Sequence, residues 1–146
     1  MQRKTFALLV ATVWCCVMFT GCGTSDPLGR QAISGEVNVD GQPLKDGSIS
    51  FEPIEKSVTS SGAMIQEGKY AIIREQGLPP GKYRVVVNAL KPGTGMTLPE
   101  GKMPGEEVGT PPEELIPPEW NTDSKNTIEV TPSGDNHFMH DIVTKK

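Results

Sequence analysis

The stretch GLPPGKYRVVVNAL, residues 77–90, decides the fold. Its Pro-Pro-Gly segment at 79–81 predicts a tight reversal, because proline presets φ and glycine tolerates a positive φ. In the run that follows, every second residue is aromatic or β-branched: Tyr83, Val85 and Val87. This alternation predicts a strand with one buried face. Val86 lies on the other face, so we expect that face to be partly covered and the strand to lie near the middle of a sheet.

Six further short runs have strand-like composition and are separated by turn residues such as Asp40-Gly41 and Glu67-Gly68. They span residues 32–39, 47–53, 62–66, 70–75, 126–131 and 136–143. No helical period of any length interrupts them. This pattern of seven short runs therefore predicts an all-β fold, a seven-stranded β-sandwich of immunoglobulin-like size. The residues expected in its core are Ile33, Val37, Ile49, Phe51, Ile72, Tyr83, Val85, Val87, Ile128, Val130, Phe138 and Ile142.

A long segment, residues 91–124, separates the last two predicted strands from the others. It is dense in proline and glycine, which disfavour both sheet ladders and helix interiors. A loop of this length within a compact domain is either functional or disordered. Its more apolar end, residues 115–121, is expected to pack back onto the domain.

The first residues read as an export signal. Arg3 and Lys4 precede an apolar run, residues 6–19, that is too short to span a bilayer. The run closes on Phe-Thr-Gly-Cys at 19–22, which resembles the lipobox of bacterial lipoproteins, although Phe19 stands where leucine is usual. This resemblance implies cleavage before Cys22 and acylation of its thiol. An ordinary signal peptide cut nearby, which leaves a soluble secreted protein, is the alternative.

Cysteine usage and charge bear on this choice. All three cysteines, Cys15, Cys16 and Cys22, lie at or before the proposed cleavage site, and acylation would remove the one remaining thiol. We therefore predict a signal peptide at 1–21, a lipidated tether at 22–31 and a β-domain at 32–146. Cleavage leaves 12 basic against 18 acidic residues, a net charge near −6. That balance argues against a nucleic-acid partner and leaves the lipid as the membrane contact.

Short motifs spread over the whole mature chain occur in a fixed order: Gly35-x-Val37, Asp40-Gly-Gln-Pro-Leu44, Ile49-x-Phe51-x-Pro53, Gly68-x-Tyr70, Leu78-x-Pro80-Gly-x-Tyr83-x-Val85, Ile116-Pro-x-x-Trp-Asn121 with Ser124, Ile128-x-Val130 and Asn136-x-Phe138. Together they resemble the small lipoproteins of planctomycete-type bacteria that carry a carboxypeptidase regulatory-like (transthyretin-like) domain. Trp120 stands where tyrosine is more usual. The resemblance implies a prealbumin-like seven-stranded sandwich, a lipid anchor and no established catalytic activity.

Candidate metal ligands are few. His137 and His140 lie three apart on a predicted strand, so they point to opposite faces and cannot share one ion without a bulge. One solvent-facing and one half-buried histidine is the expectation. The glutamates of the long segment, Glu106, Glu107, Glu113, Glu114 and Glu119, lack the spacing of a calcium loop and are interpreted as solvated.

Catalysis is not predicted. Transthyretin-like hydroxyisourate hydrolases need histidines near both ends of the domain and a C-terminal Tyr-Arg-Gly-Ser, whereas this chain ends Ile-Val-Thr-Lys-Lys and has both histidines late. No serine lies in a nucleophile-elbow context. A transthyretin-like hydrolase is thus the least favoured function, and no catalytic, cofactor or metal-binding residues are assigned.

Trp120 is the remaining candidate contact residue. It either caps the edge of the sandwich or anchors a partner. We predict a non-enzymatic lipoprotein of the cell envelope, facing the periplasm or the exterior, that serves as a binding or structural module. Its partner would be an envelope protein reached through the loop 91–124 or through an edge strand. Carbohydrate or peptidoglycan binding is the alternative, and it requires exposed aromatic side chains.

Overall fold

The computed structural model describes residues 26–55, 59–97, 99–105 and 107–144, and the prediction of an all-β fold is confirmed within them. The predicted signal peptide and Cys22 lie outside these ranges. Within them, no helix is long and apolar enough to cross a membrane. The elements are β1 (Ile33–Val39), β2 (Gln42–Pro43), β3 (Asp46–Pro53), β4 (Ser61–Gln66), β5 (Lys69–Ile72), the 3₁₀ helix η2 (Arg74–Gln76), β6 (Gly81–Asn88), β7 (Gly95–Thr97), β8 (Val108–Thr110), the 3₁₀ helix η3 (Pro118–Trp120), β9 (Thr127–Val130) and β10 (His137–Ile142).

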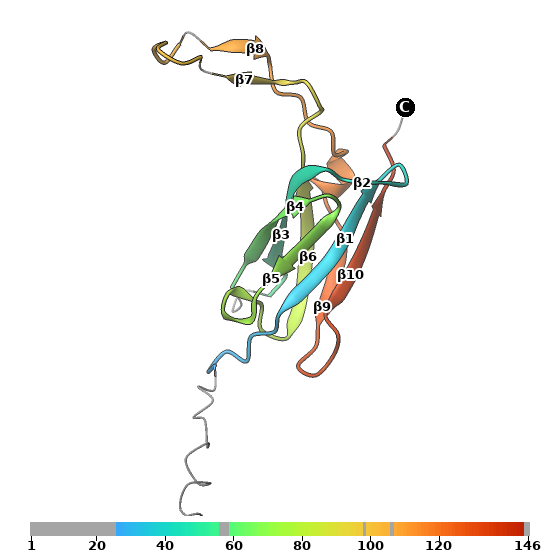
Figure 1. Ribbon diagram of the computed structural model, residues 1–146. Helices are drawn as coiled ribbons and strands as arrows, with labels where there is room; N and C mark the ends of the chain where they lie inside the picture. The colour runs from blue at the N-terminus through green and yellow to red at the C-terminus, as the bar shows by residue number, and fades with distance from the viewer. Residues whose placement is uncertain (1–25, 56–58, 98, 106, 145–146) are drawn as a thin grey trace, which may run out of the picture.

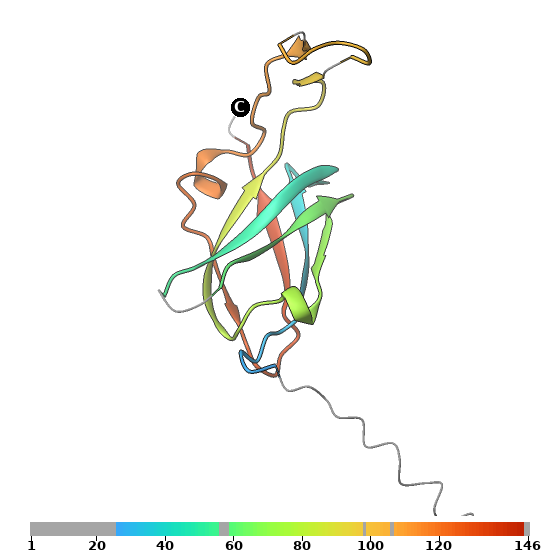
Figure 2. The same ribbon diagram turned by 90° about the vertical axis from the view of Figure 1, so that its left-hand side faces the viewer.

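Eight of these strands form one curled sheet, and β7 and β8 form a separate two-stranded ribbon (Figure 1). The order in the sheet is β10-β1-β5-β4-β3-β6-β9, with β2 attached to β1. All pairings are antiparallel except that of β1 with β10. A single register pair, Gln66 with Lys69, joins β4 to β5. The sheet folds over there, so that both its halves contribute to one core (Figure 2).

The strand predicted from residues 77–90 is β6, and it lies inside the sheet between β3 and β9. Tyr83, Val85 and Val87 are fully buried, while Val86 on the other face is half-buried, as predicted. Each such buried side chain contributes roughly 1.5–3 kcal/mol. The Tyr83 hydroxyl donates to the carbonyl of Pro79 (2.9 Å), which ties the strand to the turn that precedes it.

Each of the seven predicted strands overlaps an observed one, namely β1, β3, β4, β5, β6, β9 and β10. Two predicted turns have positive φ at both central residues: Asp40 (50°) with Gly41 (78°), and Glu67 (49°) with Gly68 (77°). Two-residue turns of this kind match the twist of hairpin strands. The short strands β2, β7 and β8 were not predicted.

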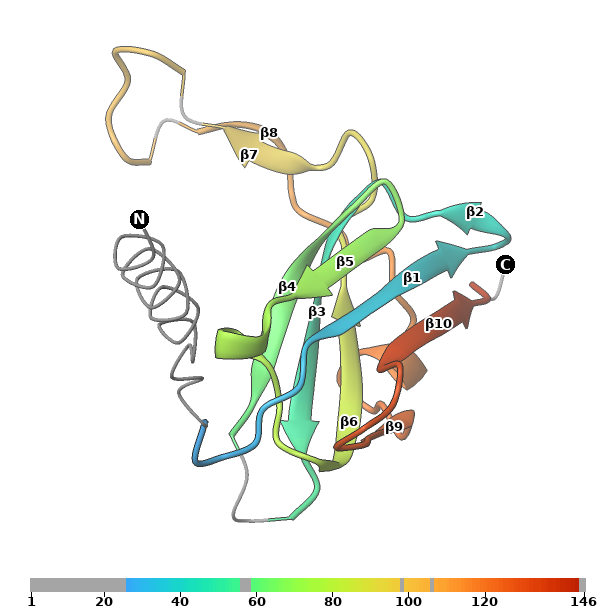
Figure 3. The ribbon, with the colours of Figure 1, turned by 60° about the horizontal axis from the view of Figure 1, so that its bottom comes forward.

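The segment 131–136 carries the chain from β9, at one end of the sheet, to β10 at the other end (Figure 3). Asn136 holds this turn. Its side-chain oxygen accepts from the amide of Thr131 (3.0 Å) and its amide donates to the Thr131 carbonyl (3.1 Å). Its own carbonyl accepts from the amide of Ser34 (3.1 Å), which starts the parallel ladder with β1.

Eleven of the twelve predicted core residues are buried, and Phe138 is half-buried against them. The core also takes in residues that the alternation did not select: Leu44, Ile65, Tyr70, Leu78, Ala89 and Ile116. Ile116 belongs to the end of the long segment, which packs back onto the domain as predicted.

Candidate functional site

The middle of the long segment forms an arm that extends beyond the sheet (Figures 1 and 2). We call residues 91–114 the arm. Proline density led us to expect no ladder there, yet β7 and β8 pair at Gly95–Thr97 and Val108–Thr110, which are the proline-free tracts. A bridge between Leu90 and Glu114 closes the arm at its base.

The base of the arm is built from hydrogen bonds. The Glu114 side chain accepts from the backbone amides of Ala89 (2.8 Å) and Ile116 (3.1 Å). Lys91 forms an ion pair with Glu113. The Thr94 hydroxyl donates to the Lys91 carbonyl (2.8 Å) and accepts from the amide of Glu113 (3.2 Å). Two of the glutamates interpreted as solvated thus hold the arm in place.

The arm presents apolar side chains to solvent. Met96, Met103 and Val108 are each more than half exposed. Methionine is flexible and polarizable, so it adapts to partners of irregular shape. Beside the base, a groove of about 410 Å³ is lined largely by apolar side chains, among them Val39, Leu44, Leu90, Pro92 and Leu115. Arm and groove place apolar surface at one end of the molecule.

Trp120 ends η3 and packs inward. Its ring makes a T-shaped contact with the ring of His140, with ring centroids 5.9 Å apart and planes at 74°. Ser124, four residues further on, is buried and donates to the carbonyl of Val85 (2.5 Å). Trp120 is half-buried against the core, the position of a cap over the domain's edge.

His140 is the buried polar centre of an aromatic row. Its ring stacks on Tyr70 at 6.1 Å, and Tyr70 in turn lies 5.9 Å from Phe51. Tyr70 and His140 share a hydrogen bond of 3.2 Å between the hydroxyl and Nε2. Burial lowers the pKa of His140 to about 4, against the opposing charge of Asp141, and burial raises the pKa of the Tyr70 hydroxyl. At neutral pH the histidine is therefore uncharged.

Gly35 makes this contact possible. It lies on β1 between Tyr70 of β5 and Phe138 of β10, with its missing side chain directed into the core. A Cβ atom there would collide with the Phe138 carbonyl and lie 2.5 Å from the Tyr70 hydroxyl. Gly35 and Tyr70 stand in motifs of the sequence, but no local pattern in the chain indicates that His140 joins them.

His137 lies on the opposite face of β10 and is exposed, so the predicted separation of the two histidines is confirmed. Its Nδ1 lies 3.0 Å from the Ser34 hydroxyl, at a shallow groove of about 500 Å³ that Glu36, Gln66 and Lys69 also line. A serine-histidine hydrolase needs a carboxylate that orients the histidine through its other nitrogen. Among the described residues, the side-chain hydrogen bond of His137 is the one to Ser34, and it joins two neighbouring strands.

No group of three histidine, cysteine or acidic side chains gathers into a metal-binding arrangement among the described residues. Glu107 accepts from the amide of Gly105 (3.0 Å), and the backbone amides of Glu107 itself and Gly105 lower its pKa. Glu106 lies outside the described ranges. Among the described residues, the aromatic side chains of Phe51, Tyr70 and Tyr83 are buried and those of Trp120 and Phe138 are half-buried.

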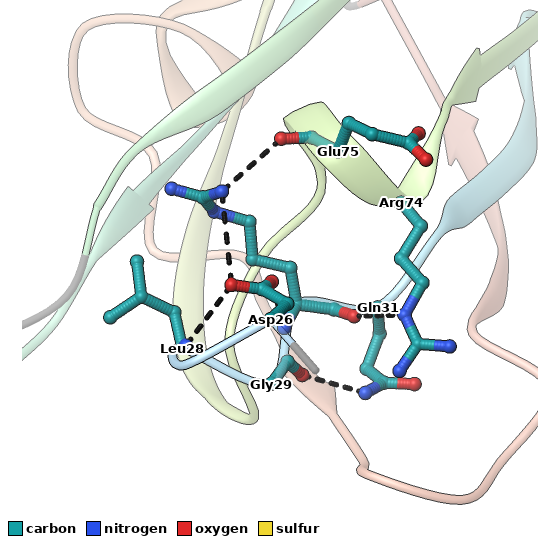
Figure 4. A network of polar contacts seen from close by, with 7 residues as sticks. Asp26, Leu28, Gly29, Gln31, Arg74 and Glu75 are labelled. Atoms are coloured by element: carbon teal, nitrogen blue, oxygen red, sulfur yellow. Dashed lines mark hydrogen bonds and ion pairs between the residues drawn. The ribbon is translucent and has the colours of Figure 1, made fainter. Parts of the chain in front are cut away.

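The described part of the predicted tether, residues 26–31, is fastened to the domain (Figure 4). The Asp26 carboxylate accepts from the amides of Leu28 (3.1 Å) and Arg30 (2.8 Å), and these bonds lower its pKa. Arg74 donates from Nε to the carbonyl of Arg30 (3.0 Å). Gln31 exchanges backbone bonds with Leu78 (2.8 and 3.2 Å).

Comparison of the chain with protein-family models, with curated proteins and with solved structures finds no significant match.

Proposed function

We propose that this chain is a lipid-anchored, prealbumin-like β-sandwich of the bacterial cell envelope, which binds a partner through its arm and catalyses no reaction. The observation that carries the proposal is the placement of the arm and the tether at opposite ends of β6. The tether meets the domain at Leu78, just before β6 begins, and the arm closes at Leu90, just after it ends. Eight strand residues span about 26 Å.

The sandwich is supported by the division of the curled sheet. Strands β5, β1 and β10 form one half and β4, β3, β6 and β9 form the other, which are the seven predicted strands. Side chains from both halves meet in one core. Two packed sheets with inward-facing alternate residues are what a sandwich requires.

The anchor is supported by the lipobox and by the fastening of the chain from Asp26 onward. If Cys22 carries the lipid, three residues separate it from Asp26, the first fastened residue, and this connection reaches at most about 14 Å. The domain then stays close to the membrane surface at its tether end. The arm, at the other end, stays accessible.

The arm is supported as the contact surface by its shape and composition. The ribbon contributes no side chain to the core. An ion pair and hydrogen bonds to a carboxylate nevertheless hold its base in a fixed position on the domain. Its exposed Met96, Met103 and Val108 are the kind of side chains that partner surfaces bury.

In-cell cross-linking followed by affinity capture tests the arm. The variant M96S/M103S/V108S keeps the ribbon but removes its apolar surface, and a second variant replaces residues 95–110 with two glycines. We expect an envelope protein to be captured with the natural chain and lost with both variants. The matched control, M64S/I73S, removes two exposed apolar side chains outside the arm and should retain the partner. Recovery of the same partner from all four chains would reject the proposal that the arm is the contact surface.

The anchor is tested separately. Metabolic labelling with a clickable fatty acid should mark the natural chain and leave Cys22→Ser unmarked, and the variant should leave the membrane fraction. Labelling of Cys22→Ser would refute the lipid anchor at Cys22, and it would leave the proposal that the arm is the contact surface unaffected.

A further inference from the structure

Strand β10 ends the curled sheet and offers an open edge (Figure 3). In its ladder with β1, the amide of Ser34 donates to the carbonyl of Asn136 and that of Asp40 to the carbonyl of Ile142. The even-numbered residues of β10 therefore turn their backbone groups toward β1. The odd-numbered residues, His137, Met139 and Asp141, turn theirs toward the open edge.

The same three residues have exposed side chains on the outer face of the sheet, and Met139 is 64% exposed. His137 contacts Ser34 through Nδ1, which leaves its Nε2 for a second partner. Asp141 accepts from the Asn38 amide through Oδ1 (2.9 Å), which leaves Oδ2. Residues of β1 thus orient both side chains, and each side chain keeps one atom that can form a further hydrogen bond.

The hydrogen-bonding side chains along this edge are self-complementary, because the imidazole of His137 and the carboxylate of Asp141 can bond to each other. His137 and Asp141 lie two residues before and two residues after Met139. An antiparallel pair of two such strands, centred on Met139, puts His137 of each copy opposite Asp141 of the other and Met139 opposite Met139. All three positions expose their backbone groups at the edge, so the pair would form about six backbone hydrogen bonds.

We propose that β10 is a homodimerisation edge, at which a second copy of this chain adds its own β10 in antiparallel orientation with Met139 on the two-fold axis. Such an isologous contact closes on itself and leaves no further edge for growth at this site. The two tethers lie at opposite ends of the pair.

The other terminal strand, β9, differs. Its open-edge residues are Thr127 and Glu129, because Asn126, Ile128 and Val130 turn toward β6. Self-pairing centred on Glu129 would place two carboxylates opposite each other, a device that blocks edge-to-edge association. The contrast favours β10 as the edge open to a second copy and supplies a matched control.

Site-directed cross-linking of the full chain tests the dimer. Met139→Cys places two thiols across the proposed axis, and a short bifunctional thiol reagent applied to cells and to detergent extracts should give a covalent dimer. Glu129→Cys places a thiol at an exposed position of the other terminal strand. We expect at least about tenfold more dimer from Met139→Cys, with the natural chain reporting any contribution from Cys22.

Charge exchange in the Met139→Cys background tests the register. H137E sets a carboxylate opposite Asp141 twice in each dimer, and we expect about a tenfold loss of cross-linking. The double variant H137E/D141K sets a lysine opposite each new glutamate and should restore the dimer. Equal cross-linking from the two cysteine positions, or no effect of H137E, would overturn the proposal. Circular dichroism of each variant checks that the exposed substitutions leave the fold intact.

Discussion

The hydroxyl of Tyr70 and Nε2 of His140 lie 3.2 Å apart inside the core, in space that Gly35 leaves open. The contact crosses over β1, because Tyr70 belongs to β5 and His140 to β10. Trp120 packs against the imidazole in a T-shaped contact. Strands β5, β1 and β10 and the end of the long segment are therefore joined at one buried, uncharged histidine, and the stability of the domain should depend on it.

Acid should destabilise the domain through His140. Its pKa is about 4 in the folded chain and near 6.5 in the unfolded chain, so between these values the unfolded chain binds the proton more readily. The stabilising contribution is complete above about pH 6.5 and is lost as the pH falls toward 4, by about 2–3 kcal/mol. Urea unfolding at pH 7.5 and pH 4 measures the difference. His140→Gln removes the titration, and an undiminished pH dependence in that variant would assign the effect to other groups.

Gly35→Ala should be strongly destabilising, by about 2–4 kcal/mol, because the new methyl group collides with the Phe138 carbonyl and displaces the Tyr70 hydroxyl. Ser34→Ala, the neighbouring residue on the opposite face, loses only an exposed hydrogen bond with His137 and should cost less than about 1 kcal/mol. Chemical denaturation of the two variants compares them. Similar values would mean that the space above Gly35 can be refilled without strain.

Trp120→Ala should cost about 2 kcal/mol and also raise the pKa of His140 toward its ordinary value, because water then reaches the imidazole. Trp120→Phe keeps a ring over His140 and should keep most of the pKa shift. NMR titration of the imidazole signals of His140 measures its pKa directly. An unchanged His140 pKa in Trp120→Ala would show that the tryptophan does not shield the histidine, which would favour its alternative role as an anchor for a partner.

Asp26→Ala should release residues 26–30 from the domain while leaving global stability nearly unchanged, since the carboxylate holds the amides of Leu28 and Arg30 and pairs with the Arg30 guanidinium (4.0 Å), all within the tether. Hydrogen exchange of a peptide covering 26–31 should speed up. Glu75→Ala is the control, because Arg30 binds the backbone carbonyl of Glu75 and not its side chain. Equal exchange in both variants and the natural chain would mean that the Gln31–Leu78 pairing alone fastens the tether.

Local patterns in the chain predicted much of this fold. The alternation at Tyr83, Val85 and Val87 identified the buried face of β6, and Asp40-Gly41 and Glu67-Gly68 identified two turns, because strand period and turn conformation depend on adjacent residues. The same logic separated His137 from His140. It failed at Phe138, which lies on the inward face of β10 yet is only half-buried, because burial at that position depends on neighbours far away in the chain.

The amino-acid sequence by itself determined the all-β class, the strand segments and the inward side chains, since each depends on residues within a few positions of one another. Only the tertiary structure decided the strand order, the Tyr70–His140 contact and the pairing of Ser34 with His137 across 103 residues. Such contacts form only when the whole core packs. The alternation of residues within one strand does not determine which other strand becomes its neighbour. The open edge of β10 likewise follows from its place at the end of the sheet.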